Sequence, residues 1–387
     1  MVGAWVVASA AWATESWERP RTPVINPAEL GLPGLSAKDC GACHTEIYQE
    51  WSSSVHAAAW WDPQFQAELN KDPEVGWLCL NCHTPVANQQ AHLVLSTQVR
   101  APDSVDNPFF DSQLRSEGVT CLSCHWTPEG VASVHPDAQA PHKLSYTPSL
   151  REDALCNGCH QAQARLEDAL VCHFNTAGEK SAAGIEQSCS DCHMPAVSRP
   201  VVHGGIARMG GRHNWPGSGI GKSSKAAVEG LNGVDVAFGG VALNDAGRSI
   251  VSVDLTNARA GHMVPSGDPE RFLRVVVSAF DEHGVEAGRT DFRIGQTWVW
   301  SPVAKKTDDN RLKPGEVRRL DWTMPRSVVA AEVRVVVEHV RLTKANLDYH
   351  VDLVKKGAAG PTIAALLDYP RGRVVFEGRF PVKGVTR

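Results

Sequence analysis

The pattern Cys-x-x-Cys-His occurs five times and constrains this chain more than any other feature. In this pattern two thiols add across the vinyl groups of a porphyrin, and the adjacent histidine binds the iron from the proximal side. Five copies therefore predict five covalent c-type haems. The predicted attachment residues are Cys40, Cys43, Cys79, Cys82, Cys121, Cys124, Cys156, Cys159, Cys189 and Cys192, and the predicted proximal iron ligands are His44, His83, His125, His160 and His193.

Two other uses of paired cysteines fit the pattern less well. Structural zinc usually takes two Cys-x-x-Cys pairs per ion, and five pairs cannot be divided evenly. Zinc also gives no reason for a histidine after every second cysteine. A disulfide across two intervening residues closes a strained ring that suits redox exchange rather than structure.

Ten of the eleven cysteines belong to the motifs, which leaves Cys172. Residues 169–173 repeat the motif with alanine in place of the first cysteine. Cys172 is therefore either the single thioether of a sixth haem or, as is more common for such a near match, a buried small apolar residue.

An iron with histidine on both faces has no vacant position, and the sequence offers more histidines than five such irons need. The distal candidates are His56, His92, His135, His142, His173, His203, His213 and His262. Residues 44–56 lack proline and glycine and predict a helix, whose rise separates its two end histidines by roughly 18 Å. His56 must then serve a different iron from His44. Residues 160–173 predict a second helix, with its end histidines about 20 Å apart.

Three loops carry most of the other candidates. The proline-rich residues 127–148 hold His135 and His142, of which one is expected to bind iron and the other to be solvated. A glycine-rich loop after the fifth motif carries His203 and His213, and glycine lets a backbone pass close to a flat cofactor. The loop at residues 261–269 is expected to dock on the haem region, with its histidine capping an iron.

From about residue 234 the hydrophobic pattern changes to period two with many β-branched residues. Strands are predicted at residues 234–243, 249–256, 271–281, 285–293, 297–300, 317–323, 332–342 and 373–382, and short helices at 343–357 and 362–368. The fold class is thus a mostly α, cofactor-cored multihaem cytochrome c domain followed by an all-β, immunoglobulin-like sandwich.

The predicted organisation has four parts. Residues 1–13 read as a remnant of a secretory signal, residues 14–36 as an extended lead-in, residues 37–228 as the pentahaem domain and residues 229–387 as the sandwich. No transmembrane span is expected after signal removal, and periplasmic, extracellular or cell-surface localisation is predicted because c-type haem is attached outside the cytoplasm. A net charge of −5, to which haem propionates add, argues against nucleic acid as a partner.

The N-terminal half resembles the multihaem cytochromes of the cytochrome c-554 and hydroxylamine oxidoreductase lineage. The resemblance rests on the residues from Cys40 to Ala57 and on Cys-Ser-Asp-Cys-His-Met-Pro at residues 189–195, and it covers about residues 36–215. It implies that His56 binds the iron of His125, that His92 caps the first haem and that His135 or His142 caps the fourth. It also implies that the second motif lacks a protein sixth ligand.

The fifth haem departs from the simplest, tetrahaem member of that lineage. The chain is more similar to larger multihaem proteins whose sandwich carries a Gly-His-x-x-Pro-(Thr/Ser)-Gly loop, here residues 261–267. Members of this lineage mostly transfer electrons, and some related cytochromes polymerise into extracellular wires.

The leading functional hypothesis is an electron carrier whose mostly bis-histidine haems serve redox partner proteins or neighbouring cytochrome subunits. One alternative is an oxidoreductase that acts on a small nitrogen or sulfur species at one open haem. The other alternative is a homo-oligomer, a subunit of an extracellular cytochrome filament.

Overall fold

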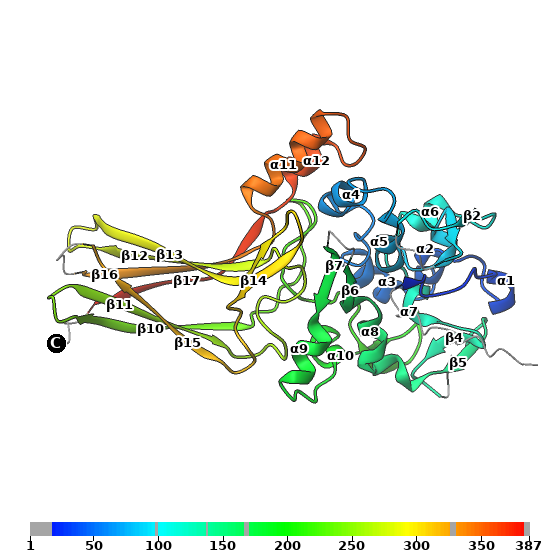
Figure 1. Cartoon of the computed structure of the whole chain (residues 1–387). Helices are drawn as coiled ribbons and strands as arrows, with labels where there is room; N and C mark the ends of the chain where they lie inside the picture. The colour runs from blue at the N-terminus through cyan, green and yellow to red at the C-terminus, as the bar shows by residue number, and fades with distance from the viewer. Residues whose placement is uncertain (1–17, 97–99, 137, 166–169, 326–329, 383–387) are drawn as a thin grey trace, which may run out of the picture.

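The structure, a computed structural model, describes residues 18–96, 100–136, 138–165, 170–325 and 330–382. A region of helices and small sheets, formed by the N-terminal part of the chain, lies beside an elongated β-rich region formed by the C-terminal part (Figure 1). The expected signal segment at residues 1–13 lies outside the described residues. Within the described residues, none of the helices has the length and apolar character needed to cross a bilayer.

Short elements make up the N-terminal region. Its helices are α1 (Pro27–Leu30), α2 (Ala37–Gly41), α3 (Thr45–Ser52), α4 (Pro63–Leu69), α5 (Gly76–His83), η2 (Ala87–Gln89), α6 (Ser112–Arg115), α7 (Leu122–His125), η3 (Pro148–Arg151), α8 (Asp153–His160), α9 (Thr176–Ala182) and α10 (Cys189–His193). Its strands are β1 (His92–Val94), β2 (Ser104–Asp106), β3 (Trp126–Thr127), β4 (Gly130–Ser133), β5 (Leu144–Tyr146), β6 (Gln161–Arg165), β7 (Leu170–Asn175), β8 (Ala196–Pro200) and β9 (Ala207–Gly211). These strands form four small sheets: β1-β2, β3-β4-β5, β6-β7 and β8-β9.

Each of the last four motifs ends a helix with its histidine, in α5, α7, α8 and α10. In the first motif α2 ends at Gly41, and His44 is the N-cap of α3. Helical backbone places residues three apart on one face, so both thiols of a motif point the same way. The local sequence thus builds each attachment point.

Two predicted helices differ in the structure: the first is present but shorter, and the second is a hairpin. The first ends at Ser52, and the chain reaches His56 through turns. The hydroxyls of Ser52 and Ser53 donate to the carbonyls of Gln49 and Glu50, at 2.9 and 2.8 Å, in competition with continued helix.

The second, at residues 160–173, is instead the antiparallel hairpin β6-β7. Gln161 pairs with Asn175 in register, and its amide donates to the Asn175 side chain at 2.8 Å. Pairing across the hairpin outweighs a weak helix preference.

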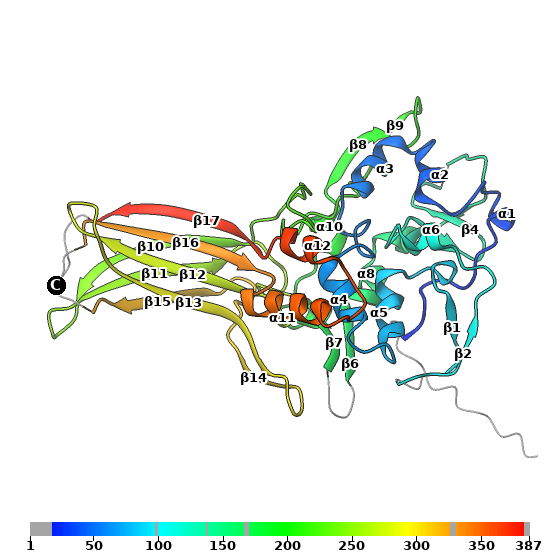
Figure 2. The ribbon, with the colours of Figure 1, turned by 90° about the horizontal axis from the view of Figure 1, so that it is seen from above.

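The β-rich region contains two sheets that share a hydrophobic core (Figure 2). The order is β10-β11-β15 in one sheet and β14-β13-β12-β16-β17 in the other. The strands are β10 (Val234–Leu243), β11 (Ser249–Asn257), β12 (Phe272–Phe280), β13 (Glu286–Val299), β14 (Lys305–Asp309), β15 (Val317–Thr323), β16 (Glu332–Val340) and β17 (Gly372–Pro381). Helices α11 (Lys344–Lys355) and α12 (Ile363–Asp368) interrupt the chain before β17.

The period-two pattern predicted most of these strands within one or two residues. Along β11 buried and half-buried positions alternate, which is the expected result for a strand with one face on the core. Two details differ: predicted strands 285–293 and 297–300 form the single strand β13, and β14 was not predicted. The residues of β14, Lys-Lys-Thr-Asp-Asp, are polar and mostly exposed, so they carry no hydrophobic alternation.

A buried polar network joins the two regions. Arg311 follows β14, and its Nη1 lies 2.5 Å from Oε1 of Glu179 on α9. The side chains of the two residues are only 5% and 3% exposed. Ser266 donates to the other carboxylate oxygen of Glu179 at 2.7 Å, and its hydroxyl lies 2.9 Å from that of Thr176. The network fixes the loop at residues 261–269 against the N-terminal region.

Candidate haem-binding sites

All five motifs line one cavity. Its volume is about 3430 Å³, which is several times the roughly 300–1,000 Å³ of an ordinary small-molecule site. Residues of the C-terminal loop, among them His262, also line it. The cavity therefore fits several large cofactors held close together rather than one small ligand.

Four of the five motif histidines face a second imidazole. The ring centres lie 6.5 Å apart for His44 and His142, 6.1 Å for His125 and His213, 6.3 Å for His160 and His56, and 6.3 Å for His193 and His262. A metal–imidazole nitrogen bond is about 2 Å long, so an iron held between two imidazoles separates their centres by about 6 Å. The four pairs thus have the spacing that bis-histidine ligation requires.

In most of these rings, Nδ1 contacts a backbone carbonyl. The Nδ1 atoms of proximal His44, His83, His125 and His193 lie 2.8, 3.0, 2.9 and 2.7 Å from the carbonyls of Val201, Ala59, Ala132 and Pro216. Those of distal His142, His213 and His262 lie 3.2, 2.9 and 2.9 Å from the carbonyls of Lys143, Gly211 and Met263. A carbonyl can only accept, so Nδ1 carries the proton and Nε2 keeps its lone pair for a metal.

Burial also favours the neutral, metal-binding form of three rings. Desolvation lowers the pKa of His56 to about 3, with a further contribution from nearby His160. Desolvation likewise lowers the pKa of His160 and of His213 to about 4. These imidazoles are neutral at physiological pH, so no proton competes with a metal for Nε2.

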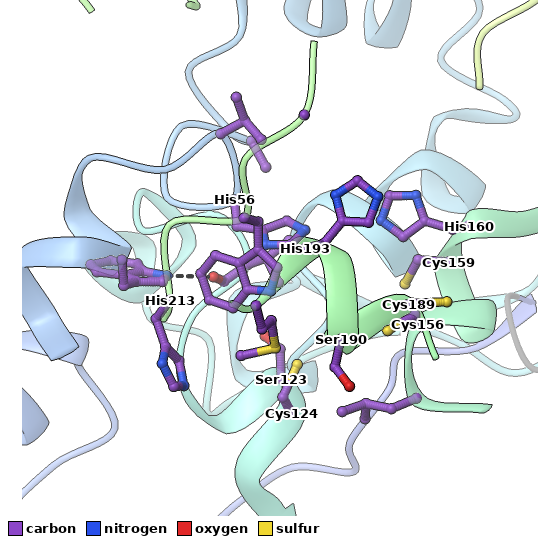
Figure 3. Close-up of a pocket in the computed structure, with 18 of the residues that line it drawn as sticks. His56, Ser123, Cys124, Cys156, Cys159, His160, Cys189, Ser190, His193 and His213 are labelled. Carbon is purple, nitrogen blue, oxygen red and sulfur yellow. Dashed lines mark hydrogen bonds between the residues drawn. The ribbon is translucent and has the colours of Figure 1, made fainter. Parts of the chain in front are cut away.

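Specific contacts position the distal histidines. The backbone N–H of His213 donates to Oε2 of Glu50 on α3 at 2.8 Å, and the same carboxylate pairs with Arg199. Gly31 adopts the left-handed conformation, with φ of 69°, where a Cβ atom would lie 3.5 Å from Cα of His142. The His56 ring makes an edge contact with Trp215, at 4.6 Å between ring centres. Figure 3 shows His56, His160 and His193 close to the cysteines of the fourth and fifth motifs.

The second motif differs from the other four. The His83 ring stacks on Phe65, with centres 3.8 Å apart and planes 5° apart, which is too close for an intervening iron. Among the described residues, no ring contact joins His83 to another imidazole. The second motif therefore offers a proximal ligand without a histidine opposite it.

These positions change the pairings that the family resemblance implied. His56 faces His160 of the fourth motif and not His125, which faces His213 instead. His142 faces His44 of the first motif and not the fourth. The helix predicted to reach His56 ends at Ser52. The turns that follow place the His56 ring beside His160 of the fourth motif.

Among the ring contacts of the described residues, none joins His92, His135 or His203 to a motif histidine. His92 lies outside the cavity lining, with a side chain that is 66% exposed and bonded to Asp106 at 3.0 Å, so the expected first-haem role does not fit this position. His135 and His203 line the cavity from loops. His173 lies on β7, with its ring centre 5.4 Å from that of Trp298.

Cysteines of different motifs touch one another inside the cavity. Hydrogen-bond contacts join the thiol of Cys40 to that of Cys121, Cys82 to Cys159, and Cys156 to Cys189. The contacts link the first motif with the third, and the fourth with both the second and the fifth. Burial raises the pKa of Cys124 to about 11, with a smaller effect from Cys159, so the third and fourth motifs are also neighbours.

Comparisons with known proteins give one family model and one solved structure. Residues 39–126 match the family model for cytochrome c554 and c-prime. The chain is also similar to the crystal structure of a penta-haem cytochrome c552 from Thermochromatium tepidum, with a TM-score of 0.58 and 20% identity over 90% of this chain and 98% of that one. A search of curated protein sequences finds no significant match. At 20% identity, the structural match indicates a similar fold.

Proposed function

We propose that this chain, a multihaem c-type cytochrome, relays electrons through five covalently attached haems, four of which have histidine on both faces of the iron. The four imidazole pairs with ring centres 6.1–6.5 Å apart are the observation that carries the proposal. When bound, a haem supplies one-electron oxidation and reduction at iron. Paired histidines close the iron to substrate, which suits transfer rather than catalysis.

The contacts between motifs support an order for the relay. The first motif touches the third, the third neighbours the fourth, and the fourth touches the second and the fifth. The fourth motif is therefore the branch point of the arrangement. In this proposal His56 and His160 are the axial ligands at the branch.

The domain division is part of the same proposal. Residues 37–228 form the pentahaem domain and residues 229–387 an immunoglobulin-like sandwich. The described hydrophobic cluster around Ile25, Val86 and Leu122 has only five buried residues, whereas the cluster between the two C-terminal sheets has seventeen. A cofactor core in the first domain accounts for that difference.

The donor and acceptor are proposed to be redox partner proteins outside the cytoplasm, where c-type haem is attached. A filament of stacked subunits is the alternative assembly, with the sandwich as an assembly module. Electron microscopy of the native exported protein distinguishes filaments from single molecules.

Replacing His262 with alanine tests the assigned ligands. H262A should convert one low-spin haem to high spin, because it removes the imidazole 6.3 Å from His193. Electron paramagnetic resonance of the oxidised holoprotein measures the change. H92A is the matched control, since the His92 side chain is exposed and outside the cavity lining. An unchanged spin state in H262A, or a change in H92A, contradicts the assignment.

The second candidate function is binding of a small molecule at one open haem, and the position of His83 favours it. Within the described residues, the His83 ring stacks on Phe65 and makes no ring contact with a second imidazole, so the iron of the second motif is the one proposed to have an open face. Carbon monoxide added to the reduced wild-type protein should shift about one-fifth of the Soret absorbance, the share of one haem in five. Absence of any shift would mean that all five irons are closed, and the relay would stand alone.

A further inference from the structure

Basic side chains gather at one end of the larger C-terminal sheet. His339 on β16 pairs in register with Leu273 on β12 and with Arg373 on β17. Arg271 lies two residues before Leu273, and Arg341 lies two residues after His339. Because residues paired in register point to the same side of a sheet, Leu273, His339 and Arg373 share a face. Arg271 and Arg341 lie directly outside the ends of β12 and β16. Arg271, His339 and Arg341 line the large cavity.

Two members of this group lack the partners that buried polar atoms require. Nε of Arg271 and Nε2 of His339 are buried and make no hydrogen bond among the described residues. No ion pair is formed by the Arg271 guanidinium within those residues. Arg341 differs, because its terminal nitrogens donate to the carbonyls of Ile220, Gly221 and Pro370, although its Nε is also unpaired.

The field at this end of the sheet is positive and poorly compensated. Burial lowers the pKa of His339 to about 3, and Arg271, Arg373 and Arg341 add to the effect by repulsion. The carboxylate of Asp62 is already paired with Lys222. Nε of Arg271 and Nε2 of His339 are buried without a partner, and a negatively charged ligand in the cavity would provide one.

The cofactor supplies such a charge, because every c-type haem carries two propionate carboxylates. Arg271 and His339 line the same cavity as the five motifs, so both residues border the space in which the haems would be held. We propose that Arg271 and His339 bind a propionate carboxylate of one haem held in this cavity. The proposal rests on the proposed haems. The guanidinium offers a planar pair of donors, and neutral His339 offers one more.

This contact would let the C-terminal domain set the potential of that haem. A cation beside a haem stabilises the reduced form, which carries one positive charge fewer. Loss of the Arg271 charge therefore makes that one haem harder to reduce. The other four haems keep their potentials, since Arg271 is assigned to a single propionate.

The experiment is a spectroelectrochemical titration of full-length, haem-loaded protein. R271Q should lower the equilibrium constant for reduction of one haem about tenfold, equivalent to 59 mV for a one-electron couple. R271K keeps the charge and should restore most of the potential. R274Q is the matched control, since Arg274 lies on the same sheet with a side chain 43% exposed beside Asp291.

Haem content, measured by pyridine haemochrome and intact mass, distinguishes failure of the proposed function from failure of the propionate contact. A wild-type protein with fewer than five haems contradicts the proposed function. Five haems in R271Q with every potential unchanged overturn the propionate contact alone. If R271Q does not accumulate, H339F is titrated instead, because it keeps an aromatic ring but has no hydrogen-bond donor. We expect a smaller decrease in the potential of one haem. An unchanged potential in H339F would overturn the contact.

A titration with sodium nitrite tests whether the negative charge beside Arg271 comes from a propionate or from a free anion. A propionate already occupies the site, so nitrite should not shift the potential of the haem that R271Q affects. Any effect of nitrite at an open haem should be the same in wild-type protein and R271Q. A nitrite-dependent shift in wild-type protein that is absent from R271Q would show that a free anion occupies the site, and would overturn the proposal.

Discussion

Replacing Cys156 and Cys159 together with serine is expected to remove one haem and to prevent the N-terminal domain from accumulating in folded form. The fourth motif touches the second and the fifth, so its cofactor would lie at the centre of the cavity. The described cluster of buried apolar side chains in this region has five members, compared with seventeen between the C-terminal sheets, so less apolar packing is available to replace the cofactor. The expected loss is comparable with the whole stability of a domain, about 5–15 kcal/mol. Intact mass, pyridine haemochrome and circular dichroism of the exported protein measure it.

C172S is the matched control for this double variant. Cys172 also lines the cavity, but it lacks a second cysteine at motif spacing. C172S should therefore keep five haems. Its free energy of unfolding should differ from that of the wild-type protein only by the effect of one small substitution in the core. Loss of a haem in C172S would reveal a single-thioether attachment at that cysteine. Normal folding of the double serine variant would contradict a cofactor core.

Arg311→Gln should cost about 3–5 kcal/mol, because it leaves the Glu179 carboxylate buried without its cation. The two side chains are 5% and 3% exposed, so water cannot replace the lost contact. Since Glu179 also accepts from Ser266, the loop that carries His262 should loosen as well. Urea unfolding followed by circular dichroism gives the free energy of unfolding, and the oxidised spectrum reports high-spin haem.

An exposed ion pair in the same domain provides the comparison. Arg319 contacts Asp254 through two hydrogen bonds, of 2.9 and 2.8 Å, and its side chain is 59% exposed. R319Q should leave the urea midpoint nearly unchanged because water and salt screen the pair. Equal effects of R311Q and R319Q would show that burial of the Glu179 contact adds nothing to stability.

The two halves of the chain were predictable to different degrees. In the C-terminal region the alternation of apolar residues is a local signal, and strands such as β10 and β15 have the predicted bounds. In the N-terminal region the predicted helix at residues 160–173 is a hairpin. Where side chains would pack on cofactors, the apolar pattern reports no partner strand or helix, and helix propensity alone is a weak guide.

Residues outside any motif were the hardest to assign. Arg271 and His339 carry no sequence signature, because an arginine before a strand and a histidine within one are ordinary surface or packing residues. They come together at one end of the sheet only because β12 and β16 are neighbours in it. The alternation along a strand predicts on which face each of its residues lies. It does not predict which strands are neighbours in the sheet.

The five predicted attachment points follow from the sequence alone, because a Cys-x-x-Cys-His motif places both thiols and the proximal histidine within a single turn of chain. The surplus of histidines likewise predicts that most irons have two imidazole ligands. Only the tertiary structure decided which histidine faces which motif, and that the described ring contacts of the second motif include no second imidazole. The reason is physical: a distal ligand is brought into place by loops remote in sequence, and its position depends on the folding of everything between.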